Sequence, residues 1–118
     1  MSENIIHYPE EIRKRVDAGM GCGSAVGEGW YDIIRELDKK IAELYPDYVV
    51  DQVKEKFGGL RYYVGIVPKD VHAAINEAIN EAEAKAEKTC DVCGEPGNIG
   101  RVGKWLIAAR CEKHKEDV

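Results

Sequence analysis

Two short stretches decide how this sequence is organised: CDVCG at residues 90–94 and CEKH at residues 111–114. Cys90 and Cys93 are separated by two residues, as are Cys111 and His114, and a loop of ordinary length joins the two pairs. This is the spacing of a tetrahedral zinc site, in which each pair can aim both ligands at one metal. We therefore predict one zinc ion, bound by Cys90, Cys93, Cys111 and His114.

The ligand set favours a structural zinc over a catalytic one, because a catalytic zinc leaves one position open to water. The zinc deaminase signature requires His-x-Glu and Pro-Cys-x-x-Cys, whereas Ala74 lies two residues after His72 and Thr89 precedes Cys90. A His-Glu-x-x-His protease motif is also absent from the sequence. Cys22 leaves two lesser alternatives open. It could replace His114 as the fourth ligand, or act as a nucleophile with His7 or His72 as its base.

Length and composition favour one globular domain over residues 1–118, with residues 89–116 as its zinc-binding subregion. The 118 residues are 44% hydrophobic and 33% charged, which is typical of a folded protein with one modest core. The sequence contains neither an apolar run long enough to span a membrane nor the features of a signal peptide. Cysteines that bind a metal, and do not form disulfides, are typical of a reducing compartment. We expect a cytoplasmic protein that does not associate with membranes.

A short helix is predicted to begin at Pro9, with Ile12 and Val16 on one face, and to end at Gly19. The glycine-rich segment 19–29 follows. It lacks the Gly-Lys-Ser/Thr ending of a phosphate-binding loop. We interpret it as a flexible connector, with a mobile loop that closes over a partner as the alternative.

Two longer amphipathic helices are predicted. The first begins at Trp30 and ends before Pro46, and its apolar residues recur every three or four positions: Trp30, Ile33, Ile34, Leu37, Ile41 and Leu44. The second starts around residues 68–70, with Asp70 as its cap, and runs to about Lys88. Its apolar face contains mostly small residues suited to close packing: Val71, Ala74, Ile75, Ala78, Ile79, Ala82 and Ala86.

Between these helices, the period of two over residues 49–57 and 60–67 predicts a β-hairpin turning at Gly58-Gly59. Pairing Phe57 with Leu60 puts an apolar set on one face: Val53, Phe57, Leu60, Tyr62, Val64 and Ile66. The other face then carries Lys54, Lys56, Arg61 and Tyr63. In this register Lys56 lies opposite Arg61, an arrangement of like charges that costs stability. We take these four side chains as the candidate contact surface, with a simple solvated face as the alternative.

The C-terminal region is predicted to contain the Cys90 turn and a hairpin punctuated by Gly97, Gly100 and Gly103, with residues 105–109 as its returning strand. A short helix carrying Cys111 and His114 would follow. This order resembles a treble clef. The predicted fold class is α+β: amphipathic helices on a small antiparallel hairpin, with a treble-clef-like zinc turn at the end.

Three segments together resemble a family of small uncharacterised zinc-site proteins encoded by bacteria and their phages. They are GWYDII at residues 29–34, VKEKFGGLRYY at residues 53–63, and the CxxCG and CxxH pairs of the tail. The resemblance covers residues 27–114. It implies a bacterial or phage-infected host cell and a zinc site, and it implies no catalytic residue.

These observations favour a small non-enzymatic binding protein with a structural zinc. A net charge of −5 and a pI near 5.2 favour another protein as the partner. Nucleic-acid binding through the basic face of the 49–67 hairpin is the alternative. A small enzyme that uses Cys22 or an open zinc position is the third hypothesis.

Overall fold

The computed structural model describes residues 8–16, 26–102 and 106–114. Two short 3-10 helices, η1 (Glu10–Arg15) and η2 (Glu28–Trp30), precede the α-helix α1 (Tyr31–Leu44). A first hairpin of β1 (Val50–Lys56) and β2 (Gly59–Val64) follows, then α2 (Lys69–Glu87), then a second hairpin of β3 (Asn98–Val102) and β4 (Leu106–Arg110). Each hairpin forms its own two-stranded antiparallel sheet. The α+β prediction is confirmed.

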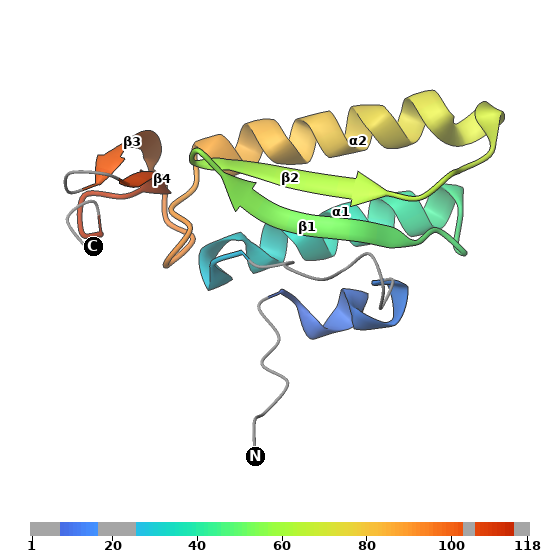
Figure 1. Cartoon of the computed structure of the whole chain (residues 1–118), viewed down its shortest axis with the longest axis horizontal. Coiled ribbons are helices and arrows are strands. Elements are labelled where there is room, and N and C mark those ends of the chain that lie inside the picture. The colour runs from blue at the N-terminus through green and yellow to red at the C-terminus, as the bar shows by residue number, and fades with distance from the viewer. Residues whose placement is uncertain (1–7, 17–25, 103–105, 115–118) are drawn as a thin grey trace, which may run out of the picture.

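The helices α1 and α2 pack against each other, and α2 also packs along β2 (Figure 1). The predicted apolar stripe of α1 is buried from Trp30 to Ile41, but Leu44 is 38% exposed. In α2, five residues of the predicted stripe are buried, whereas Ala74 is exposed. The buried residues are Ile75, Ala78, Ile79, Ala82 and Ala86. The core also takes Ile12 from η1 and Val53, Leu60 and Tyr62 from the first hairpin.

A polar network inside this core joins four segments of the chain. Asp38 of α1 accepts hydrogen bonds from Arg15 Nε at 2.6 Å and from the Tyr48 hydroxyl at 2.5 Å. The hydroxyls of Tyr48 and Tyr62 lie 2.9 Å apart, and both side chains are almost fully buried. Because burial disfavours the tyrosinate, the pKa of each phenol is raised, and both remain protonated donors.

The helix boundaries differ from the predictions at two places. The segment after Pro9 is a 3-10 helix that ends at Arg15, and Val16 instead forms a parallel bridge with Val50 of β1. Pro68, and not Asp70, is the N-cap of α2, and no side chain in the described part of the chain caps this helix. Pro68 suits this place because its fixed φ and missing N–H cost nothing where no helical partner exists.

The first hairpin forms, but its turn is Phe57-Gly58 and not Gly58-Gly59. Lys56 pairs with Gly59, and both turn residues have positive φ, +54° at Phe57 and +84° at Gly58. These angles define a type I′ turn, whose twist matches that of the strands. The predicted pairing of Phe57 with Leu60 and of Lys56 with Arg61 is therefore wrong. Since the register changes by two residues, the four predicted contact residues still keep their face. A bulge between Val50 and Gln52 brings Val50 opposite Val64 and into the core.

Candidate metal centre and contact surface

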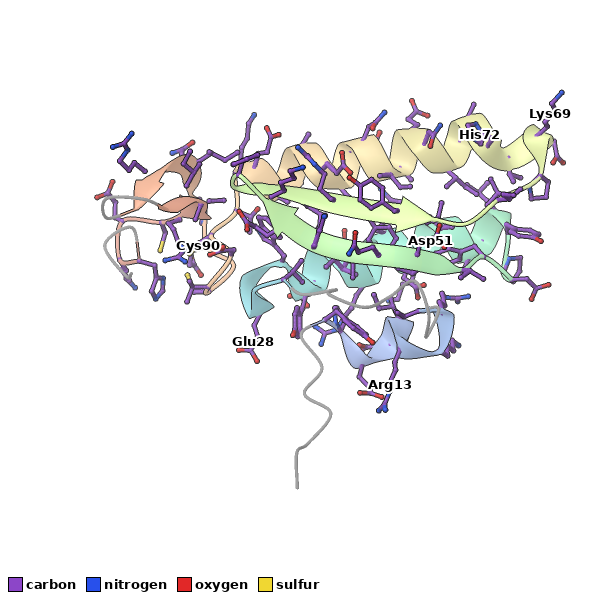
Figure 2. The ribbon with its side chains drawn as sticks, viewed as in Figure 1. Arg13, Glu28, Asp51, Lys69, His72 and Cys90 are labelled. Carbon is purple, nitrogen blue, oxygen red and sulfur yellow. The ribbon has the colours of Figure 1, made fainter. Side chains whose placement is uncertain are left out.

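The metal-binding prediction concerns four side chains that the structure brings together. The ligand atoms of Cys90, Cys93, Cys111 and His114 all lie within 4.8 Å of one another and could hold a metal ion. Nδ1 of His114 lies 3.5 Å from the Cys90 sulfur and 3.3 Å from the Cys111 sulfur, and the sulfurs of Cys93 and Cys111 are 3.7 Å apart. Figure 2 shows Cys90 beside the second hairpin.

The first ligand pair is held by a tight turn. The Gly94 N–H donates to the Cys90 carbonyl at 3.0 Å, and the Cys90 N–H donates to the Glu95 carbonyl at 2.8 Å. Gly94 has a φ of +85°, which only glycine adopts at little cost, so this residue allows the tight turn. The second pair sits on a turn in which the His114 N–H donates to the Cys111 carbonyl. Residues 112–114 are a turn, and residues 115–118 of the predicted terminal helix lie outside the described chain.

The electrostatics around Cys90 favour the thiolate that a metal requires. Burial acts to raise the pKa of the Cys90 thiol, but backbone N–H groups of Cys93, Cys111 and Val92 outweigh it and lower the pKa to about 6. The amides of both ligand turns therefore stabilise negative charge on this sulfur.

Arg110 connects the two ligand turns through its guanidinium. It donates to Asp91 Oδ1 at 2.7 Å from Nε and to the His114 carbonyl at 3.0 Å from Nη1. The Asp91 and Arg110 side chains are only 12% and 14% exposed. Burial raises the pKa of Asp91, although Arg110 opposes this shift. Neither residue was predicted, because an Asp inside a Cys-x-x-Cys turn carries no signal of a distant partner.

The candidate metal centre, formed by the four ligand residues, is joined to the core by Gly27, Gly29 and Trp30. The Gly29 N–H donates to the Asp91 carbonyl at 3.0 Å, and Trp30 Nε1 donates to the Thr89 carbonyl at 2.9 Å. A Cβ on Gly27 would lie 1.9 Å from the Asp91 oxygen. These glycines therefore allow two backbones to meet, which corrects the interpretation of residues 26–29 as part of a flexible connector. The Gly-x-Gly spacing directly before a Trp was the available signal.

The four predicted contact residues lie on the face of the first hairpin opposite its buried side chains. Lys54 pairs with Arg61 across the strands, so like charges oppose each other, although the sequence had predicted Lys56 in this place. Lys56 is exposed and Tyr63 is 46% exposed. Two residues predicted on the apolar face do not reach the core, since Phe57 is 69% and Ile66 is 100% exposed.

The remaining candidates from the sequence lie apart from the metal centre or outside the described chain. His72 is exposed on α2, where its Nδ1 lies 3.5 Å from the Asn76 amide nitrogen. Cys22 and His7 are not among the described residues, so their predicted alternatives stay predictions.

The chain matches no family model, no curated protein and no solved structure in the comparisons made. The resemblance to the bacterial and phage zinc-site proteins therefore stays a prediction. Within the described residues, no helix has the length and apolar character needed to cross a membrane.

Proposed function

We propose that this protein is a non-enzymatic binding module whose C-terminal hairpin is held by a structural zinc ion. One observation carries the zinc assignment: the spacing of the ligand atoms. Zinc bonds of about 2.3 Å to sulfur and 2.0–2.1 Å to nitrogen, at tetrahedral angles, put two sulfurs about 3.8 Å apart and a sulfur and a nitrogen about 3.5 Å apart. Of the six separations, three are 3.7, 3.5 and 3.3 Å, and all six lie within 4.8 Å.

A structural role follows from the ligand set. Three thiolates and an imidazole fill the four positions of a tetrahedral zinc, which leaves none for a substrate or an activated water. The two ligand pairs flank β3 and β4, so the ion would close this hairpin at its base. Metal binding of this kind supplies folding free energy, which a two-stranded hairpin needs, because such hairpins are marginally stable alone.

The proposed contact surface is the outer face of the first hairpin, with Lys54, Lys56, Arg61 and Tyr63. Helix α2 packs along β2, and Val53, Leu60 and Tyr62 are buried on the other face. Like charges placed opposite each other reduce the stability of a hairpin, so the Lys54–Arg61 pair supports a role in binding an anionic partner. Both an acidic protein and a nucleic acid have the required charge.

Metal analysis of the purified protein tests the zinc assignment. We expect one zinc per chain in the wild type and loss of zinc in Cys93→Ser and His114→Ala variants. Cys22→Ser is the matched control, and it should retain the ion. Zinc retained in His114→Ala but lost in Cys22→Ser would assign the fourth ligand to Cys22. Protein purified without metal, and unable to take up zinc, would refute the assignment.

Affinity capture from the native host tests the surface. A Lys54→Glu/Arg61→Glu variant should lose a partner that the wild type retains. Lys39→Glu/Lys69→Glu makes the same change in net charge at two exposed positions on α1 and α2, and it should retain that partner. Equal losses in the two variants would show that net charge, and not this face, determines binding.

A further inference from the structure

Phe57 occupies a backbone conformation that a bulky side chain avoids. Its φ of +54° is in the left-handed region, where the first position of a type I′ turn strongly favours Asn, Asp or Gly. Burial does not offset this cost, since the side chain is 69% exposed. The Nζ of Lys56 lies 5.9 Å from the centroid of its ring. An exposed aromatic ring at a backbone position that disfavours bulky residues indicates that the ring contacts a ligand.

The surface next to Phe57 contains unpaired cations and a second exposed ring. Within the described chain, neither Lys54 nor Lys56 forms an ion pair. Arg61 lies opposite Lys54, near the Glu83 carboxylate of α2. Tyr63 follows two residues later on the same face. From Gly59 to Tyr63 the strand advances about 14 Å, at about 3.4 Å per residue. Three cations thus lie between two aromatic rings.

The net charge of the protein is acidic, but the local charge of this surface is basic. Helix α2 alone contains five acidic and two basic residues and packs along β2, where Glu83 is its carboxylate near Arg61. In the first hairpin, the Glu55 carboxylate accepts a hydrogen bond from the Gly58 N–H. Asp51, labelled in Figure 2, lies at the end of β1 away from the turn. The preference for a protein partner rested on net charge, and this distribution weakens it.

We infer that this face, together with Phe57, binds single-stranded nucleic acid. This inference rests on the proposed contact surface and names its ligand. Lys54, Lys56 and Arg61 contact phosphates, and the rings of Phe57 and Tyr63 stack on unpaired bases. Cations that follow a backbone and aromatic rings that receive bases are the two components of non-specific single-strand binding. An acidic peptide would use the cations, but it offers no flat partner for either ring.

The inference is tested with the zinc-loaded full-length protein and fluorescently labelled oligothymidylate and oligouridylate, by anisotropy. Each phosphate contact on a single strand contributes about −0.7 to the slope of log affinity against log salt, so three contacts predict about −2. A fourfold rise in salt, from about 50 to 200 mM, should therefore weaken binding roughly 15- to 20-fold. Lys54→Glu/Arg61→Glu should abolish binding, whereas Lys39→Glu/Lys69→Glu should not.

Removal of either ring should weaken binding without unfolding the protein. Phe57→Asn and Tyr63→Ala should each reduce affinity roughly 5- to 150-fold, which is the range for loss of one base–aromatic stack. Asn suits the turn better than Phe, so Phe57→Asn should keep or raise the melting temperature. Loss of binding by this variant therefore cannot come from misfolding.

Three results would overturn the inference. They are no binding at low salt, wild-type affinity in both ring variants, and displacement of the oligonucleotides by polyglutamate as effectively as by unlabelled strand. The last result would assign the face to an acidic protein. None of them changes the zinc content or the capture experiment, so this inference can fail while the proposed function stands.

Discussion

Gly29 is the position at which a single added methyl group should separate the metal centre from the core. A Cβ there would lie 2.1 Å from the Cys90 oxygen and 2.6 Å from the Gly94 nitrogen, which are backbone atoms of the first ligand turn. That turn would have to move, and the bond of the Gly29 N–H to the Asp91 carbonyl would break. We therefore expect Gly29→Ala to reduce both stability and metal affinity.

The magnitude follows from three contributions. Overpacking costs about 1–3 kcal/mol, and the lost hydrogen bond costs about 1 kcal/mol. Replacing Gly by Ala stabilises the folded state by about 0.4–1 kcal/mol, because it reduces the conformational entropy of the unfolded chain. The expected net loss is about 2 kcal/mol, within a range of roughly 1–4 kcal/mol. Urea unfolding of the zinc-loaded protein measures this loss, and competition with a zinc chelator measures the metal affinity.

Gly100→Ala is the matched control, because among the described residues, its two sequence neighbours aside, no atom lies within 4 Å of the Cβ it would add. Its unfolding free energy should stay within about 0.5 kcal/mol of the wild type. If Gly29→Ala unfolds at the same urea concentration as Gly100→Ala and binds zinc equally well, the close backbone contact does not hold the metal centre, and the reasoning is wrong.

Three further predictions concern other parts of the molecule. Phe57→Asn should raise the unfolding free energy by roughly 1 kcal/mol in urea, because a left-handed backbone costs a bulky residue about 1–2 kcal/mol; a lower midpoint would contradict the turn geometry. Asp38→Ala should lower the unfolding free energy by about 3 kcal/mol. The Arg15 guanidinium would keep its bond to the Pro46 carbonyl but lose its carboxylate partner, in a site where both side chains are only 12–13% exposed. A change below about 1 kcal/mol would argue against the network. Chelation of the metal should remove hydrogen-exchange protection from β3 and β4 while α1 and α2 keep theirs. Equal protection with and without metal would show that the ion does not stabilise this hairpin.

The sequence predicted best what depends on local spacing. The ligand pairs are each two residues apart, and each pair needs only a short turn to converge, so all four candidates come together. The α1 stripe likewise repeats every three or four residues, and its buried part runs from Trp30 to Ile41. The burial predicted for Leu44 is wrong because this residue occupies the last position of α1, where the core no longer covers the apolar stripe.

The sequence did not predict features that depend on distant partners or on an exception to a local sequence preference. The rule for hairpin turns selects Gly58-Gly59, and only the structure shows Phe57 in the place that a glycine would fill. The Gly-x-Gly spacing before Trp30 could indicate a close backbone contact, but it does not identify Asp91 as the partner. The Lys54–Arg61 opposition could be predicted only once the register was known.

The hydrogen bond from Trp30 to Thr89 places a natural fluorophore one residue from the first candidate ligand. Indole emission responds to the polarity around the ring and to the partner of its N–H group. Release of the ion should therefore change the emission of Trp30 without any added dye. A Trp105→Phe variant, which removes the second indole of the chain, would make the protein an optical reporter of its own metal occupancy.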